Sequence, residues 1–276
     1  MKGCHIPGHF GEWLQGRLGA GGPVVLITMP CACFGVRALH RPARSGFVLR
    51  APGLSAGRAQ VFLARLGLRL RGRVDLSPVG APGLGTGIST VSLLALARLA
   101  GWRGPPERLA RACIAAEGAS DPLMFSSPER LLWASRRGRV MDHMPALPAH
   151  EVLGGFCGGP VRTDARDRDF PDIADLVLRW HRARRLVDFA ALASESAARC
   201  SARRGPAQET PPQLARDLGA LGWTRAHTGA ARGLIFAPGT IPDNAPQTLR
   251  EAGWTGLCRF GVNRHEQPSP GLSGYW

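Results

Sequence analysis

The sequence predicts an α+β fold in two halves, residues 1–147 and residues 148–276. Three features lead to this prediction. An apolar, β-branched run over residues 22–37 is typical of buried strands, and a strongly apolar helix is expected over residues 89–100. From residue 151 a Gly-rich strand followed by amphipathic helices starts a second mixed pattern. A chain of 276 residues is long enough for two such domains.

In the first half, residues 22–37 are interpreted as one or two buried strands. The helix over residues 89–100 is expected to be capped by Ser89 or Thr90 and to end at Gly101. Residues 59–70 are compatible with either a helix or a strand. The remaining expected elements are strands at residues 47–50 and 74–76, a helix at 106–117 that starts with proline, and a hairpin at 131–140 that turns at Arg137-Gly138.

In the second half, the pattern begins with a Gly-rich strand over residues 151–160. Apolar residues at helical spacing predict three helices in a row, at residues 173–184, 187–203 and 212–221. The last elements expected are a strand–turn–strand at residues 224–236, a helix at 245–252 and a strand at 256–262. This half therefore combines one sheet with several helices.

The net charge of +15 suggests a nucleic-acid-binding protein until the basic residues are inspected. Of the 35 basic residues, Lys2 is the only lysine, and the arginines are scattered without a run of five. The chain has one tyrosine and no basic stretch interleaved with aromatic residues. No specific nucleic-acid binding is therefore expected, whereas small polyanions such as nucleotides would be attracted.

Membrane insertion and secretion are not expected either. The longest apolar run contains a proline and is too short to span a bilayer, and the first fifteen residues lack the apolar core of a signal peptide. The seven cysteines are an odd number without a Cys-x-x-Cys pair, which favours a reduced, cytoplasmic protein. Cys31 and Cys33 face the same way on the predicted strand and are interpreted as small core residues rather than ligands.

A Gly-rich stretch over residues 82–90 directly precedes the apolar helix and predicts a phosphate site. Its glycines allow close backbone approach and positive φ, and the helix N-terminus offers free N–H groups. It is neither a Walker A loop nor a dinucleotide-binding fingerprint, and a loop that merely turns into a helix remains the alternative. The residues assigned to the nucleotide are Gly83, Leu84, Gly85, Thr86, Gly87, Ile88, Ser89 and Thr90.

Two further segments stand in a fixed order with this loop. One is Gly11-Glu12-Trp13-Leu14-Gln15-Gly16, and the other is Ala226-His227-Thr228-Gly229. In this order the three segments resemble the motifs of the GHMP kinases, most closely the L-threonine kinase branch of cobalamin biosynthesis. The resemblance covers about residues 4–240. It implies an N-terminal half like the second domain of ribosomal protein S5, a ferredoxin-like C-terminal half, and the use of ATP with Mg²⁺.

The resemblance also implies roles for individual residues. Glu117 and the Thr86 hydroxyl would ligate Mg²⁺, and Asp121 would be the catalytic base. The alternatives are a solvated helix end for Glu117 and a simple turn residue for Asp121. The residues assigned to the substrate are Gly11, Glu12, His227, Thr228 and Gly229.

The sequence departs from the family pattern at Gly87, which stands where a second serine is usual, and at Arg232, where a small residue is common. Gly87→Ser is expected to be tolerated provided that Gly87 does not need positive φ. The resulting hypothesis is transfer of the ATP γ-phosphate to L-threonine. Alternatives are another small hydroxylated metabolite, or a sensor that binds nucleotide or metabolite without turnover. The sequence does not fix the oligomeric state, and a homodimer is compatible with it.

Overall fold

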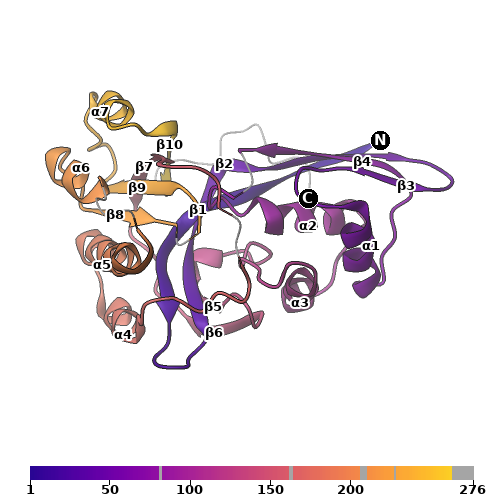
Figure 1. Cartoon of the computed structure of the whole chain (residues 1–276), viewed down its shortest axis with the longest axis horizontal. Coiled ribbons are helices and arrows are strands. Elements are labelled where there is room, and N and C mark those ends of the chain that lie inside the picture. The colour runs from indigo at the N-terminus through magenta and orange to yellow at the C-terminus, as the bar shows by residue number, and fades with distance from the viewer. Residues whose placement is uncertain (81–82, 162–163, 206–209, 227, 263–276) are drawn as a thin grey trace.

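A long hairpin of two strands, β1 (Lys2–Arg17) and β2 (Val24–Pro42), runs through the middle of the molecule (Figure 1). The structure is a computed structural model, and it describes residues 1–80, 83–161, 164–205, 210–226 and 228–262. β2 follows from its apolar, β-branched sequence, as expected. β1 was not expected, because proline, glycine and charged residues interrupt it. Pairing with β2 overrides that weak local preference.

Two sheets are built around this hairpin. The N-terminal sheet has the order β3 (Phe47–Arg50), β4 (Gly72–Val79), β2, β5 (Leu131–Ala134) and β6 (Arg139–His143), with β1 paired to β2. The C-terminal sheet has the order β10 (Thr255–Val262), β7 (His150–Phe156), β9 (Ala231–Phe236) and β8 (Gly222–Arg225), all antiparallel. The mixed α+β prediction is confirmed.

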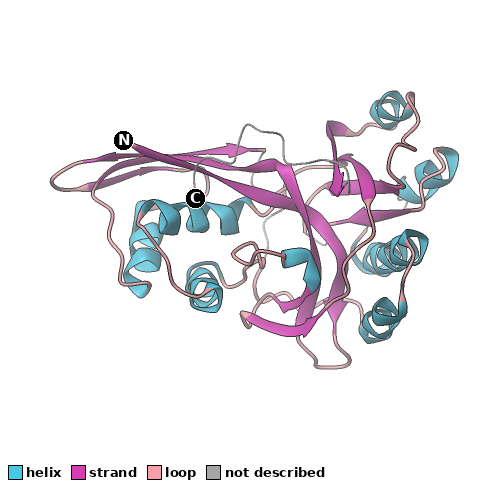
Figure 2. Cartoon of the chain, turned by 180° about the vertical axis from the view of Figure 1, so that it is seen from behind, coloured by secondary structure: helices cyan, strands magenta, loops and turns pink. Residues whose placement is uncertain are grey.

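Helices cover both sheets (Figure 2). The first group is α1 (Ala56–Arg65), α2 (Ile88–Leu99), α3 (Pro106–Glu117) and the short 3₁₀ helix η1 (Pro128–Arg130). The second group is α4 (Ala174–Arg182), α5 (Leu186–Arg204), α6 (Pro211–Asp217) and α7 (Ala245–Glu251). Of the segment 59–70, which was compatible with a helix or a strand, residues 59–65 belong to α1 and residues 66–70 to neither. None of the helices in the described ranges is both long and apolar enough to cross a membrane.

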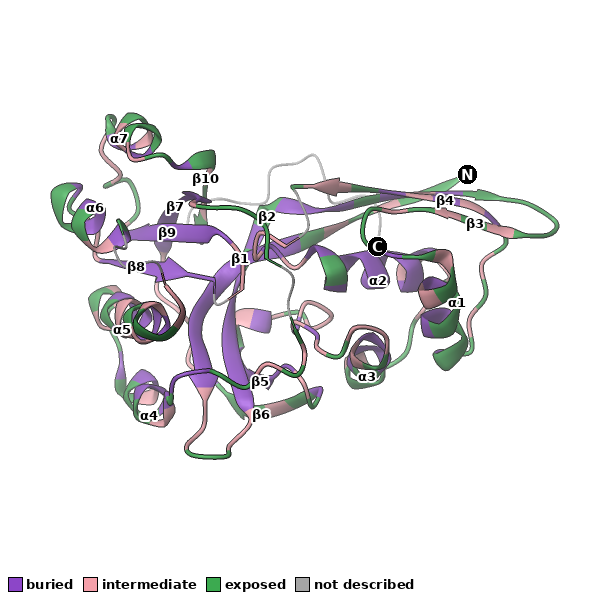
Figure 3. Cartoon of the chain, viewed as in Figure 1, coloured by how far each residue is buried: buried purple, intermediate pink, exposed green. Residues whose placement is uncertain are grey.

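The start of α2 differs from the expectation. Gly87 caps this helix in the left-handed conformation at φ +71°, with no side-chain cap, so Ser89 and Thr90 lie inside the first turn. The C-terminal expectation is correct, because Gly101 follows the C-cap in the left-handed conformation. α2 is apolar almost all round and buried against the N-terminal sheet, as Figure 3 shows.

One hydrophobic core belongs to both halves of the chain. Trp13 and Ile27 of the central hairpin pack with Trp180 of α4, Phe189 of α5 and Ile235 of β9. A separate core lies between the N-terminal sheet and the helices α1, α2 and α3. Because the shared core draws on residues from either side of position 147, the division into residues 1–147 and 148–276 stays a prediction.

Candidate active site

The Gly-rich loop before α2 is held from behind by its own carbonyl groups. Each of four successive carbonyl oxygens accepts a backbone hydrogen bond from another segment. The pairs are Gly83 O with Val161 N at 2.8 Å, Leu84 O with Ala231 N at 3.0 Å, Gly85 O with Gly11 N at 2.9 Å and Thr86 O with His9 N at 3.3 Å. Segments from β1, from β9 and from beyond β7 therefore fix the loop.

This arrangement leaves the N–H groups of the loop open. Within the described ranges, the N–H groups of residues 84–87 donate no hydrogen bond to another protein group, and α2 starts without a side-chain cap. The first N–H groups of a helix lack intrahelical partners and carry partial positive charge. A row of such groups is the usual backbone site for a phosphate.

Three glycines show how closely the segments are packed. A Cβ on Gly85 would lie 2.5 Å from the Cβ of Ala226, and one on Gly229 would lie 2.5 Å from the carbonyl carbon of Leu84. A Cβ on Gly87 would lie 2.4 Å from His9 Cδ2. The N-terminal segment, the loop and the C-terminal turn thus meet at one place, although long stretches of chain separate them.

Gly87→Ser was expected to be tolerated only if Gly87 does not need positive φ, and this condition is not met. Gly87 needs positive φ, and its missing side chain leaves room for the imidazole of His9. The substitution is accordingly expected to be harmful rather than tolerated.

Asp121 lies beside the first turn of α2. The Thr90 hydroxyl donates to Asp121 Oδ2 at 3.1 Å and accepts from the Asp121 backbone N–H at 3.2 Å. The short loop that carries Asp121 follows the left-handed end of α3 at Gly118, and the Trp133 indole N–H fixes it by donating to Ser120 O at 2.7 Å. A carboxylate is thereby placed next to the open N–H groups.

His9 forms an ion pair with this carboxylate. Its Nε2 lies 3.3 Å from Asp121 Oδ2, and its Nδ1 lies 3.1 Å from Gly11 O. Burial opposes protonation of His9, but the charge and hydrogen bond of Asp121, with help from Glu12, raise its pKa to about 9. With both ring nitrogens facing acceptors, His9 is an imidazolium at neutral pH.

The pKa of Asp121 moves in the opposite direction. Burial favours the neutral acid, but the His9 charge and the hydrogen bonds from His9 and Thr90 outweigh it and lower the pKa of Asp121 below its usual range. Asp121 is therefore ionised throughout the neutral range.

Glu12 completes an acidic group at this end of the cleft. One side-chain ligand atom each from His9, Glu12 and Asp121 lie within 4.8 Å of one another. Carboxylate oxygens are what Mg²⁺ prefers, whereas an imidazolium cannot ligate a metal. The buried Thr86 Oγ1 and Gln15 Oε1 have no hydrogen-bond partner in the described part of the protein, and both residues line the same cleft. These oxygens fit a bound magnesium nucleotide.

One cleft collects most of the residues that the sequence analysis selected. Those lining it are Glu12, Gly83, Gly85, Thr86, Gly87, Ile88, Ser89, Asp121 and Thr228. Thr90 supports Asp121 from behind, Leu84 packs beside Phe10, and Gly11 and Gly229 contact the back of the loop. His227 lies outside the described residues.

Glu117 is not brought to this cleft. It ends α3, and its carboxylate forms an ion pair with Arg58 of α1. Because it is absent from the cleft lining, the structure offers Glu12 rather than Glu117 as the carboxylate next to Asp121.

The cleft lining also includes residues that were not selected from the sequence, among them His9, Gln15 and Arg136. The guanidinium of Arg136 is half-buried, donates from Nε to Ala165 O at 2.9 Å, and lies over the Phe170 ring. Gln15 lies within the segment Gly11-Glu12-Trp13-Leu14-Gln15-Gly16 and His9 lies two residues before it, so their position in the sequence was a usable signal. No feature of the sequence distinguished Arg136, because it is one of many scattered arginines.

The sequence matches no known protein-family model, and no curated protein sequence matches it. Solved structures do match over nearly the whole chain. Mevalonate kinase from Methanococcus jannaschii is 9% identical, covering 95% of this chain and 98% of that one, with a TM-score of 0.63. Phosphomevalonate kinase from Streptococcus pneumoniae is 12% identical, covering 95% and 99%, with a TM-score of 0.62.

Homoserine kinase from Cytophaga hutchinsonii is 15% identical, covering 95% of each chain, with a TM-score of 0.59. At these identities the similarity establishes the fold. The chain has the two-sheet α+β fold of these three kinases.

Proposed function

We propose that this protein is an ATP-dependent kinase of the GHMP type that phosphorylates the hydroxyl group of a small molecule. One observation carries the proposal: an ionised carboxylate, Asp121, is hydrogen-bonded to Thr90 at the same helix N-terminus that presents the open N–H groups. Phosphoryl transfer depends mainly on positioning and charge stabilisation, and this arrangement supplies both. The fold shared with several kinases supports the same conclusion.

The loop and the acidic group would hold magnesium ATP together. The N–H groups of residues 84–87 would bind phosphate oxygens, while Glu12 and the Thr86 hydroxyl would ligate the metal. When bound, magnesium ATP supplies the phosphoryl group and neutralises charge that develops on its oxygens.

Asp121 would accept a hydrogen bond from the acceptor hydroxyl and receive its proton during transfer. His9 keeps this carboxylate ionised and fixes its orientation through the contact at 3.3 Å. A base with such a low pKa cannot remove the proton before attack, so the proton moves as the new bond to phosphorus forms. This order suits a loose transition state.

We further propose L-threonine as the acceptor, giving O-phospho-L-threonine for cobalamin biosynthesis. The resemblance of Gly11-Glu12-Trp13-Leu14-Gln15-Gly16 and Ala226-His227-Thr228-Gly229 to the L-threonine kinases supports this choice. The cleft also has a cation, Arg136, that can pair with an α-carboxylate, as an amino-acid substrate requires.

A coupled ADP-release assay over hydroxylated amino acids and sugar alcohols tests both levels of the proposal. We expect threonine to be preferred over serine, and both over homoserine by about 100-fold in kcat/KM, because one extra methylene moves the nucleophile out of line. The Asp121→Asn variant, in which kcat is expected to be strongly reduced, serves as the negative control.

The possible results separate the alternatives. Turnover of a different hydroxylated metabolite would overturn threonine as the acceptor and leave the kinase class intact. Calorimetric binding of magnesium ATP without turnover of any acceptor would overturn the kinase and favour a sensor.

A further inference from the structure

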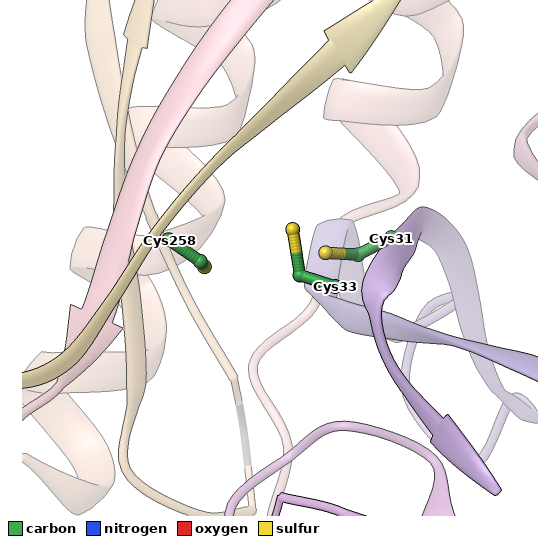
Figure 4. A group of neighbouring side chains, drawn as sticks. All are labelled: Cys31, Cys33 and Cys258. Carbon is green, nitrogen blue, oxygen red and sulfur yellow. The ribbon is translucent and has the colours of Figure 1, made fainter. Parts of the chain in front are cut away.

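Three cysteines that are far apart in the sequence come together between the two sheets. Cys31 and Cys33 lie on β2, and Cys258 lies on β10. Their sulfur atoms all lie within 4.8 Å of one another. Figure 4 shows the side chains of Cys31 and Cys33 on one side and that of Cys258 on the other, directed into the same space.

The pairing of β2 is irregular where two of the cysteines lie. Gly35 pairs with Pro7 of β1 and Cys31 pairs with the next residue, Gly8, so residues 32–34 have no partner in β1. Cys33 lies in this irregular segment, and its side chain lies close to that of Cys31 (Figure 4). β10 is the edge strand of the C-terminal sheet, and it supplies the third sulfur opposite that pair. Arg259, the next residue on β10, accepts a hydrogen bond from Cys33 Sγ through its carbonyl oxygen at 3.6 Å.

The three cysteines differ in exposure. Cys31 is buried, Cys258 is partly buried, and Cys33 is exposed.

Sulfur ligands select soft cations. Zn²⁺ binds thiolates at about 2.3 Å in tetrahedral sites, which places the sulfurs about 3.8 Å apart. The three sulfurs lie within 4.8 Å of one another, so no separation would have to shorten by more than about 1 Å to reach that spacing. Mg²⁺ and Ca²⁺ prefer oxygen ligands, so this cluster is chemically distinct from the acidic group at the cleft.

We propose that Cys31, Cys33 and Cys258 form a zinc site that links β2 to β10, with an exchangeable fourth ligand. Among the described residues, no fourth histidine, cysteine or carboxylate belongs to the cluster. Three protein ligands with one open position are typical of zinc sites that accept water or a small molecule. The exposed Cys33 shows that such a ligand can reach the site from solvent.

A disulfide is the competing use of these residues. Cys258 could pair with Cys31 or Cys33, but either bond would leave one thiol of the cluster unused. Convergence of three thiols, rather than two, is what favours a cation. The structure contains all three as free thiols.

Cobalt substitution tests the proposal directly. The reduced full-length protein, stripped with a chelator, is titrated with Co²⁺ and followed by thiolate-to-cobalt charge-transfer absorption, after which Zn²⁺ is added. We expect one equivalent of Co²⁺ to produce the band and Zn²⁺ to abolish it. Cobalt bound at His9, Glu12 or Asp121 gives no thiolate band, so the two sites are distinguished.

Three variants provide the controls. Cys258→Ser and Cys33→Ser should lose the band and bind Zn²⁺ at least about 100-fold more weakly, since changes outside the ligand shell alone cost 10–100-fold. Cys33 is exposed, so its variant should fold normally. Cys4→Ser removes a part-buried thiol on β1 and should keep the band.

Thermal unfolding gives an independent measurement. Zn²⁺ at about 100 times its dissociation constant should raise the Tm of the wild type by roughly 5–10 °C and leave that of Cys258→Ser unchanged. Absence of the band in the reduced wild type, or its persistence in both cluster variants, would overturn the zinc site. So would a Cys258 disulfide forming in place of metal binding.

Discussion

One end of the candidate active site is formed by backbone atoms and the other by side chains. At the Gly-rich end, the loop before α2 is held by hydrogen bonds of its carbonyl groups to β1, to β9 and to the segment after β7, and Gly85 and Gly87 leave no room for a Cβ. The acidic end is side chain: His9, Glu12 and Asp121 come from two separate elements and lie within 4.8 Å of one another.

This difference determines how each end tolerates change. A backbone site has no group that a substitution can remove, so it fails only when a new atom displaces the loop. A side-chain site loses its charge through a single substitution while its geometry persists.

Asp121→Asn should lower kcat by about 10²–10⁴-fold, because loss of a general base costs that much. The affinity for magnesium ATP should change little, since the loop is intact. Steady-state kinetics and calorimetry together measure the two quantities. Asp142→Asn is a matched control, because Asp142 also forms a pair with a histidine, His181 at 2.9 Å, but on the surface. Near-full activity of Asp121→Asn would disprove the assignment of the base.

His9→Gln should change the pH dependence of stability. The pKa of His9 is raised from 6.5 to about 9 in the folded protein, so its contribution is complete below about pH 6.5 and is lost as the pH rises through 9. The contribution is at most about 3 kcal/mol in the free energy of unfolding. Denaturant unfolding of the wild type between pH 6 and 10 should show this decline, and the variant should lack it.

A suitable comparison for His9 is His150, whose pKa burial lowers. A lowered histidine pKa destabilises the fold only below about pH 6.5. His150→Gln should therefore change the free energy of unfolding only below that pH. An unchanged slope above pH 6.5 in His9→Gln would show that His9 is not charged in the folded protein.

Gly87→Ser should weaken magnesium ATP binding by about 10-fold or more, because the new Cβ meets His9 and the left-handed conformation is strained. Gly101→Ser is the matched control at the other end of α2. Its φ is also positive, but no atom lies within 4 Å of the added Cβ. Gly101→Ser should lose about 1 kcal/mol of stability and Gly87→Ser at least that much, but only Gly87→Ser should lose nucleotide affinity, as calorimetry would measure. Equal nucleotide affinities of the two variants would show that the loop at Gly87 does not bind the nucleotide.

Glu12→Gln should raise the Mg²⁺ concentration needed for half-maximal activity by about 10-fold, because a charged oxygen ligand is replaced by a neutral one. Glu117→Gln should leave this concentration within about 2-fold, since Glu117 pairs with Arg58 outside the cleft. Magnesium titrations of the two variants compare the two carboxylates directly. The reverse result would restore Glu117 as the metal ligand.

The Gly-rich end of the candidate site could be predicted from the sequence because the pattern that indicates it lies within one short segment. Gly83, Gly85 and Gly87 directly precede an apolar run, and the structure places all three in the left-handed conformation. Most helices and strands could be predicted for the same reason, since hydrophobic periodicity and turn residues are patterns that extend over only a few residues. The error at the α2 cap arose because Ser89 and Thr90 are good caps in isolation, whereas the loop geometry requires Gly87 there.

The acidic end could not be predicted because its members are brought together over long distances. Glu117 and Asp121 are close in sequence, yet only Asp121 reaches the cleft, since α3 ends at Glu117 and turns it towards Arg58. β1 was missed as a strand, so the positions of His9 and Glu12 relative to Asp121 could not be inferred. The cysteine cluster could not be predicted for the same reason, because it requires β10 to lie beside β2.

The α+β class, the order of most elements and the Gly-rich loop before α2 can be predicted from the amino-acid sequence, because they follow from contacts between near neighbours in the chain. The placement of Glu12 beside Asp121, the ion pair of His9 with Asp121 and the convergence of Cys31, Cys33 and Cys258 are visible only in the folded structure. These features depend on the pairing of β1 with β2 and on the packing of the two sheets. Such contacts join residues that no local pattern relates, so folding has to bring them together before their chemistry exists.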